Sequence, residues 1–238
     1  MKVYRSELKQ YISYYDYVQL SKALSRVMKK DGYQQDKRGY FIRSLYFDTI
    51  GKKDYEEKII GYENRKKIRL RIYDTNTQKV KLEIKNKYGD YMLKETATIS
   101  RQEALDLIDG RIDWLHNKDN DTLRQVYFYF KQDLYRPIII IDYYREAYYL
   151  DFNNIRITFD KKVSSSKDFH KFFEPDTNNV VFTNPNEVIL EIKFNHDLPY
   201  WVKRILSPYS PDKLSISKYC LGIDKLQRNY DGEGSYGF

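Results

Sequence analysis

The chain has a single cysteine, Cys220, among 238 residues. One thiol excludes an intramolecular disulfide and any zinc site built from several cysteines, and it is typical of a reducing compartment, so we expect a cytoplasmic protein. The three histidines, His116, His170 and His196, have no serine or cysteine nucleophile in their sequence context, and we assign none of them to catalysis. The longest aliphatic run, Ile138 to Ile141, is far too short to span a bilayer, and the amino terminus lacks the apolar stretch of a signal peptide. The sequence therefore predicts a soluble protein without a transmembrane segment.

Familiar nucleotide and zinc motifs are missing as well. The sequence contains no GxxxxGK(S/T) loop, no GxGxxG turn and no HExxH helix. With 41% hydrophobic residues the chain can build one sizeable domain, which we place at residues 1–230. Residues 231–238 are rich in glycine and are expected to form a flexible tail.

Positive charge is in excess, with 42 Lys and Arg residues against 34 Asp and Glu residues and a formal net charge of +8. This excess favours an anionic partner, but it leaves nucleic acid, a membrane surface and phosphorylated small molecules open. The 25 tyrosines would suit an aromatic binding surface, yet codon bias explains them equally well in a sequence rich in Lys, Asp and Asn. The number of tyrosines therefore does not indicate a function.

The most informative pattern is the alternation of charged and apolar residues in several strand-like segments. It occurs at 69–71, 81–87, 156–160 and 190–193, where Arg, Lys and Glu alternate with Leu, Ile or Phe. Residues two apart share one face of a strand, so each segment presents a charged row opposite an apolar face. One such strand would be an ordinary solvated face. Several of them predict a sheet that curls with its charged faces inward, forming a basic channel suited to a polyanion and a metal ion.

Other patterns place elements around these segments. They predict strands at 3–12, 39–48, 65–73, 79–87, 91–99, 138–150, 155–160 and 188–195, and helices at 16–30, 122–134, 198–206 and 215–226. A further short helix begins at a capping box of Ser100 and Glu103. The segment through Gly51 and Gly61 is predicted to be a lysine-rich connection between strands. Residues 161–186 are predicted to form an irregular excursion without regular secondary structure. We expect an α+β fold, an antiparallel β-barrel tunnel of about eight strands with flanking helices.

Permanent cations with interleaved glutamates suit phosphoryl transfer, because that reaction depends mostly on positioning and on neutralising charge. An attacking phosphate oxygen is already ionised at neutral pH and needs no general base, so a site without a catalytic histidine favours phosphate-to-phosphate transfer. Two like charges about 5 Å apart repel by about 3 kcal/mol at an effective dielectric of about 20, so such a cluster is costly when it is empty. The glutamates would repel phosphate unless they hold a divalent cation, and oxygen ligands favour Mg²⁺ or Mn²⁺.

Eight short motifs occur in a fixed order: Arg5-Ser-Glu-Leu-Lys9, Ser44-Leu-Tyr-Phe-Asp48, Lys67-Ile-Arg-Leu-Arg-Ile-Tyr73, Leu82-Glu-Ile-Lys85, Tyr144-Arg-Glu-Ala147, Arg156-Ile-Thr-Phe-Asp160, Leu190-Glu-Ile-Lys193 and Ser217-Lys-Tyr219. Each is weak alone. The ordered set resembles the VTC domain, the polyphosphate polymerase catalytic domain within the triphosphate tunnel metalloenzyme fold related to CYTH proteins. The resemblance implies an ATP:polyphosphate phosphotransferase that binds ATP and polyphosphate or pyrophosphate in a basic tunnel, with no nucleic acid partner.

The resemblance also implies the site residues. Catalytic roles would fall on Lys9, Arg69, Arg71, Lys85 and Arg156, substrate binding on Lys94, Arg145, Lys193 and Lys218, and binding of Mn²⁺ or Mg²⁺ on Glu191. Yeast members carry an inositol-phosphate-sensing domain and membrane helices, for which this chain has no room. Coupling to a membrane would therefore require a separate partner.

Two other functions fit the same features. Attack by water would give a triphosphatase acting on inorganic triphosphate or a nucleotide. The opening strand argues against a triphosphatase. It reads Arg5-x-Glu7-x-Lys9, whereas hydrolytic tunnel enzymes commonly have Glu at the position of Arg5. Replacing that Glu by Arg removes a metal or water ligand. The chain could also be a non-catalytic polyanion binder, either a polyphosphate sensor or an RNA-binding protein that uses basic and aromatic residues.

Overall fold

The computed structural model describes residues 5–32, 39–89, 91–209 and 215–233. The chain divides into two compact units. Unit 1 comprises Met1–Phe41, Tyr143–Val163 and Val181–Ser217, and unit 2 comprises Ile42–Asp142, Ser164–Val180 and Lys218–Phe238. Each unit has a hydrophobic core of its own. Within the described ranges no helix is long and apolar enough to cross a membrane.

Eleven strands of the described residues belong to one hydrogen-bonded sheet. Its order is β1-β11-β9-β8-β3-β5-β6-β4, with β7 paired to β6, β10 to β9 and β2 to β8. The strand pairs with a defined register are antiparallel. Together with the helices this makes an α+β fold, as the sequence predicts. The closed barrel of about eight strands is not confirmed, because in the described part of the chain the order ends at β1 and β4 without a pairing between them.

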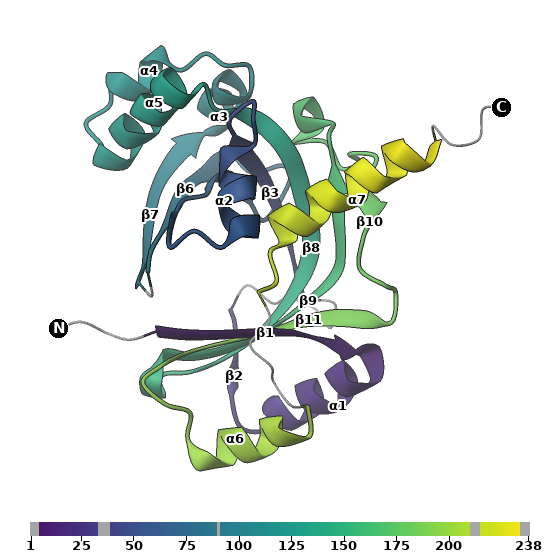
Figure 1. Cartoon of the computed structure of the whole chain (residues 1–238). Helices are drawn as coiled ribbons and strands as arrows, with labels where there is room; N and C mark the ends of the chain where they lie inside the picture. Colours follow the sequence, from purple (N-terminus) through teal and green to yellow (C-terminus); the bar gives the residue numbers. More distant parts are fainter. Residues whose placement is uncertain (1–4, 33–38, 90, 210–214, 234–238) are drawn as a thin grey trace. The chain divides into compact units, whose positions relative to one another are not determined.

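Unit 1 packs two helices against one side of its strands (Figure 1). Leu190 of β11 enters the core with Leu20 and Leu24 of α1 and with Val202 of α6. Because side chains alternate along a strand, Glu191 of β11 faces the opposite side. The elements with residues in this unit are β1 (Arg5–Ser13), α1 (Tyr14–Leu24), β2 (Lys29–Lys30), the start of β3 (Tyr40–Asp48), β8 (Arg136–Leu150) from Tyr143, η1 (Phe152–Asn154), β9 (Ile155–Ser166) up to Val163, the end of β10 (Val180–Val181), β11 (Glu187–Asn195), α6 (Tyr200–Leu206) and η3 (Ser207–Tyr209).

Unit 2 contains a meander whose apolar face is covered by helices. Helices α3 and α5 contact β7 (Figure 1), and the core includes Leu70, Leu82, Leu107 and Val126. Glu83, next to Leu82, lies on the opposite face of its strand. The elements with residues in this unit are β3 from Ile42, α2 (Lys53–Ile60), β4 (Asn64–Arg65), β5 (Ile68–Ile72), β6 (Lys79–Tyr88), β7 (Tyr91–Ser100), α3 (Arg101–Ile108), α4 (Asp113–His116), α5 (Asp121–Asp133), β8 up to Asp142, the end of β9, η2 (Phe169–Lys171), the start of β10 and α7 (Lys218–Glu233).

Elements with local sequence signals are confirmed. Ser100 accepts a hydrogen bond from the backbone N–H of Glu103, and the Glu103 carboxylate accepts one from the Ser100 N–H, which is the predicted capping box of α3. Helix α5 begins after Asn120, whose side chain caps it. The expected tail at 231–238 overlaps the end of α7 at Glu233, and its remainder lies outside the described residues.

Other local predictions are wrong. The helix predicted at 16–30 ends at Leu24, and Lys29–Lys30 instead form β2 against β8. Those two residues gain ladder hydrogen bonds with β8 in place of further helical ones. The segment through Gly51 and Gly61 contains α2, and β9 continues to Ser166, inside the predicted irregular excursion.

Candidate functional site

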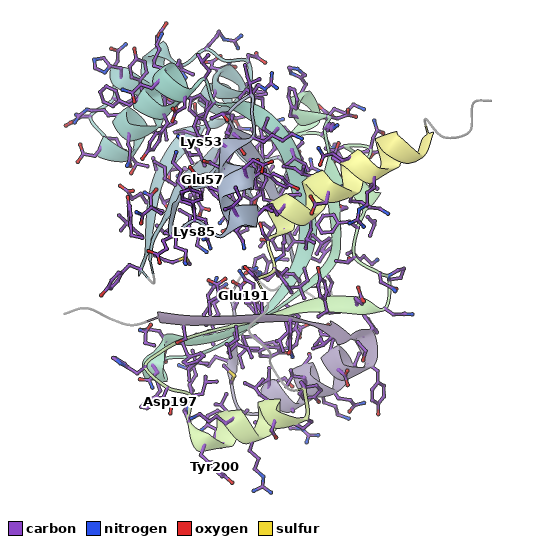
Figure 2. All side chains as sticks on the ribbon, viewed as in Figure 1. Lys53, Glu57, Lys85, Glu191, Asp197 and Tyr200 are labelled. Atoms are coloured by element: carbon purple, nitrogen blue, oxygen red, sulfur yellow. The ribbon has the colours of Figure 1, made fainter. Side chains whose placement is uncertain are left out.

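In unit 1 the strand register gathers cations around one buried carboxylate. We call this group the Glu191 cluster (Glu191, Lys9, Lys193 and Arg145). Lys9 of β1 lies opposite Glu191 of β11, which Figure 2 labels. The Lys9 and Lys193 Nζ atoms lie 3.7 and 2.8 Å from Oε1 of Glu191. Arg145 of β8 approaches the other oxygen, with its Nη2 3.3 Å from Oε2. Glu191 is only 4% exposed, so its charge is balanced by these cations rather than by water.

Further carboxylates orient the same cations. Arg145 makes a bidentate pair with Asp160 of β9, at 2.6 Å from Nε and 2.7 Å from Nη2. Asp160 stands at the end of a sequence motif, but sequence reasoning assigns it no role, because its partner comes from another strand. Lys9 also pairs with Glu7. Burial would lower the pKa of Lys9, but Glu191 and Glu7 outweigh it and raise that pKa. Burial would likewise lower the pKa of Arg145, and Asp160 raises it well above its usual range. Both side chains therefore remain charged at neutral pH.

Arg156 belongs to the neighbouring row of unit 1. Its register partner is Lys193 of the Glu191 cluster. Nη2 of Arg156 donates to Oδ2 of Asp31 at 2.5 Å and to the Tyr40 hydroxyl at 3.0 Å. The structure thus holds this predicted catalytic residue beside the cluster, through partners of its own.

Unit 2 contains a second buried glutamate among cations. We call this group the Glu83 cluster (Glu83, Arg69, Arg71 and Lys94). Arg69 of β5 is the register partner of Glu83 of β6, and its Nε donates to Oε2 at 2.7 Å. Lys94 Nζ lies 2.5 Å from Oε1, and Arg71 Nη1 lies 3.9 Å from Oε2. Burial would raise the pKa of Glu83, but the arginines and the lysine outweigh it and lower the pKa to about 2.

Glu83 is a site residue that sequence reasoning missed. It occupies in Leu82-Glu-Ile-Lys85 the place that Glu191 occupies in Leu190-Glu-Ile-Lys193. This repeated motif is the signal that could have found it. In each unit the motif supplies a buried glutamate followed by a lysine on the same face of the strand.

The other predicted site residues of unit 2 are Lys85 and Lys218. Lys85, labelled in Figure 2, is the next residue on the Glu83 face of β6 and lies opposite Lys94 of β7 in the register. Lys218 is the first residue of α7. Both are half-buried. Tyr46 of β3, which sequence reasoning also missed, accepts a hydrogen bond from Arg69 at 2.9 Å.

The predicted site residues therefore divide between the two units. All of them lie on strands except Lys218, which begins helix α7. Convergent, permanently charged donors with carboxylates between them are suited to binding phosphate groups. The set in unit 1 comprises Lys9, Arg145, Arg156, Glu191 and Lys193, and the set in unit 2 comprises Arg69, Arg71, Lys85, Lys94 and Lys218.

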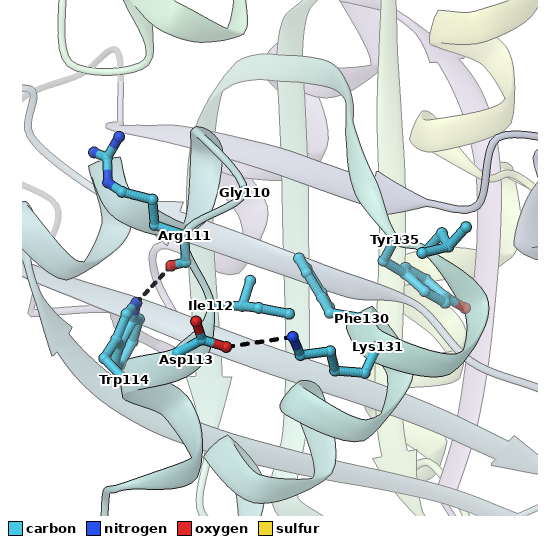
Figure 3. Close-up of a pocket in the computed structure, with 9 residues that line it drawn as sticks. Gly110, Arg111, Ile112, Asp113, Trp114, Phe130, Lys131 and Tyr135 are labelled. Carbon is cyan, nitrogen blue, oxygen red and sulfur yellow. Dashed lines mark hydrogen bonds and ion pairs between the residues drawn. The ribbon is translucent and has the colours of Figure 1, made fainter.

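A separate hollow of about 630 Å³ lies in unit 2 between α5 and the segment after α3 (Figure 3). Trp114, Phe130 and Tyr135 supply its aromatic walls. Its polar groups bond to one another: Trp114 Nε1 donates to the Arg111 carbonyl at 3.0 Å, and Lys131 pairs with Asp113 at 3.3 Å. None of the predicted site residues lines it.

Glu191 is the carboxylate of the Glu191 cluster to test as a ligand for a divalent cation. In the described residues, no group of three His, Cys, Asp or Glu side chains is arranged to hold a metal. Mg²⁺ usually keeps several waters and takes one or two carboxylates together with substrate phosphates. One buried carboxylate such as Glu191 fits that mode, whereas an all-protein metal cage does not fit.

Comparisons with known proteins support this picture at the level of fold and family. A structure described as a putative adenylate cyclase from Bacillus halodurans superposes with a TM-score of 0.51 at 12% identity, covering 90% of this chain and 95% of that one. At this identity the likeness shows a shared fold alone. A conserved hypothetical protein from Pyrococcus furiosus gives a TM-score of 0.47 at 13% identity, with coverage of 90% and 96%. A chain of the Mediator head module of Schizosaccharomyces pombe gives a TM-score of 0.45 at 10% identity, covering 86% of this chain and 95% of that one.

A search of curated protein sequences finds no match. A search against family models does find one. The model of the VTC domain matches residues 4–227, which is nearly the whole chain and contains all the motifs quoted above. This confirms the family inferred from those motifs, and the chain belongs to the VTC domain family.

Proposed function

We propose that this protein is a metal-dependent polyphosphate polymerase, which transfers the γ-phosphate of ATP to the end of a polyphosphate chain and releases ADP. The observation that carries the proposal is the pair of clusters. In each cluster one buried glutamate, Glu191 or Glu83, is surrounded by three cationic side chains. Cations fixed in advance by protein carboxylates need little reorganisation when a phosphate arrives, which is the main requirement of phosphoryl transfer.

The cations divide into two kinds. Arg69, Arg71, Lys9, Lys85 and Arg156 would contact the reacting phosphates and neutralise the charge that develops on them. Lys94, Arg145, Lys193 and Lys218 would hold the nucleotide and the chain. The acceptor phosphate is ionised at neutral pH, so no protein base is needed to activate it.

Glu191 would hold Mg²⁺ or Mn²⁺ together with oxygens of the substrate. Such an ion, when bound, supplies positive charge that neutralises phosphate oxygens. The protein's own part is to present the carboxylate rigidly. Lys9, Lys193 and Arg145 do so by surrounding it, and a phosphate chain would give those cations alternative partners.

The direct test is to incubate purified protein with ATP, Mn²⁺ and a short polyphosphate primer, and to stain a gel for polyphosphate. We expect chain growth with release of ADP. Arg69→Ala should abolish it, whereas Arg124→Ala, which removes an exposed arginine of α5, should not. Absence of chain growth with ATP intact would overturn the proposal, and orthophosphate without chain growth would identify a triphosphatase instead.

The same preparation separates polyphosphate from RNA as the ligand. An RNA-binding protein would bind single-stranded RNA without metal, with an affinity that falls steeply as salt rises. We expect no RNA binding at moderate salt. Metal-independent RNA binding without turnover would favour the non-catalytic alternative.

A further inference from the structure

Tyr46 stands at the end of the charged row of unit 2. The antiparallel register sets Tyr46 of β3 opposite Arg69 of β5, and Arg69 opposite Glu83 of β6. The guanidinium of Arg69 is shared between the two neighbours. Its Nε donates to Glu83 at 2.7 Å and its Nη1 donates to the Tyr46 hydroxyl at 2.9 Å.

The hydroxyl of Tyr46 has a proton left to donate. A phenol oxygen both accepts and donates, and here the bond with Arg69 uses it as an acceptor. Within the described ranges that bond is the one hydrogen bond this hydroxyl makes, and Tyr46 is 8% exposed. A buried donor without an acceptor is unfavourable, so a ligand that supplies an acceptor gains affinity there.

The surrounding charge makes this proton acidic. Burial would raise the pKa of Tyr46, but Arg69, Arg71 and Lys67 outweigh it and lower the pKa to about 8. An acidic hydroxyl is a strong donor to an anionic oxygen. The cations that lower its pKa are those that would draw a phosphate to the Glu83 cluster.

The ring of Tyr46 is rigidly held. It stacks on Tyr219 of α7, with ring centroids 5.1 Å apart and planes 29° apart. The Tyr219 hydroxyl donates to Asp48 at 2.5 Å, and Asp48 accepts backbone hydrogen bonds from Asp54 and Tyr55 at the start of α2. The position of the hydroxyl is therefore set by the packing of β3, α2 and α7 rather than by solvent.

We propose that the Tyr46 hydroxyl donates a hydrogen bond directly to a phosphate oxygen of the ligand held by the Glu83 cluster. Tyr46 is then a substrate-contacting residue, and Arg69 positions both its hydroxyl and the phosphate. The inference rests on the proposed function for the identity of the ligand as a phosphate chain. It involves binding alone and no covalent step.

The test compares Tyr46→Phe with the wild type for binding of inorganic tripolyphosphate, measured by calorimetry without ATP. The phenylalanine keeps the ring that stacks on Tyr219 and loses only the hydroxyl. We expect binding to weaken about tenfold, as for loss of a hydrogen bond to a charged group. Tyr129→Phe is the matched control, because the Tyr129 hydroxyl accepts from Gln125 within α5. It should bind as the wild type does.

A second measurement uses the wild type, so it does not depend on the folding of a variant. Carbon-13 labelling of tyrosine Cζ should show by NMR one resonance that titrates near pH 8 and is missing in Tyr46→Phe. Tripolyphosphate should raise that pKa, because it neutralises the cations and accepts the proton.

The outcomes separate this inference from the proposed function. If tripolyphosphate binds Tyr46→Phe within twofold of the wild type and leaves the tyrosine resonance unmoved, Tyr46 does not contact the ligand, although polymerisation can still occur. If binding weakens and the resonance moves but no polyphosphate forms, the contact stands and the polymerase proposal fails. If the wild type binds no tripolyphosphate, both fail.

Discussion

Glu191 is the negative centre of a cluster of cations, so its effects on binding and on turnover should be opposite. Glu191→Gln removes one charge with little change of shape, and polyphosphate binding without metal should hold or tighten. Metal-dependent turnover should collapse. In contrast, Arg69→Ala should weaken nucleotide binding and reduce turnover by about 100-fold or more.

Calorimetry with a chelator and turnover at saturating Mn²⁺ measure the two effects of Glu191→Gln. Lys193 and Arg145 lose a partner in this variant, so thermal unfolding should be recorded alongside to confirm that the protein is folded. Turnover within about threefold of wild type would show that Glu191 is not the essential metal ligand.

Glu83 should make the stability of the protein depend on pH in the acid range. Its pKa is lowered from 4.5 to about 2, so its stabilisation is fully present above pH 4.5 and is lost as the pH falls toward 2. The loss should be at most about 3 kcal/mol. Glu83→Gln should flatten the dependence of unfolding free energy on pH between 5 and 2, measured by urea unfolding. Glu63→Gln, at an exposed position of the same unit, should keep the wild-type slope, and an equal slope in Glu83→Gln would contradict the prediction.

At the level of elements, the start of β3 depends on one close backbone approach in unit 1. Gly39 has a φ of +90°, and a Cβ there would lie 2.2 Å from the carbonyl oxygen of Arg145. Gly39→Ala therefore forces β3 and β8 apart and displaces Tyr40, the hydrogen-bond partner of Arg156. We expect a loss of roughly 2 kcal/mol or more and weaker tripolyphosphate binding.

Gly32→Ala is the control for this effect, because no atom lies within 4 Å of a Cβ built there. Thermal unfolding of the two variants measures the difference. Equal stabilities would mean that the approach of Gly39 to β8 does not constrain the strand.

The elements also show which signals are local. The capping box of α3 was predictable, because Ser100 and Glu103 lie within one turn of each other. Helix α2 was not, because Lys52 provides no side-chain cap and the carboxylate of Asp48 instead accepts from the backbone N–H groups of the second and third helical residues. Asp48 precedes the helix by several residues and ends a strand, so no pattern of adjacent residues reveals its role.

For the whole molecule, we expect polyphosphate binding to depend less on the net charge of +8 than on the positions of the cations. Removing a cation that contacts a polyanion reduces the dependence of log affinity on log salt by about one unit. Lys94→Ala, in the Glu83 cluster, should have this effect on polyphosphate binding. Lys131→Ala, which pairs with Asp113 on the helical side of unit 2, should leave the slope unchanged. Equal slopes measured over a series of KCl concentrations would show that net charge alone governs binding.

The sequence by itself determined the family, the α+β class and most strands. It also determined which side chains share a face, because alternation along a strand needs no partner. Arg69 and Arg71 must lie on one side of β5, and Leu70 on the other, in any sheet. The ordered motifs then identified the VTC domain, which the family match confirms.

Only the tertiary structure decided which charges meet. Arg69 faces Glu83 because β5 and β6 pair in one register, and Lys9 faces Glu191 because β1 pairs with β11, a strand about 180 residues further along the chain. A shift of one residue in either pair would send every side chain to the other face. Register depends on the packing of both cores and on distant turns, so the partners of Tyr46 could not be derived from any local pattern.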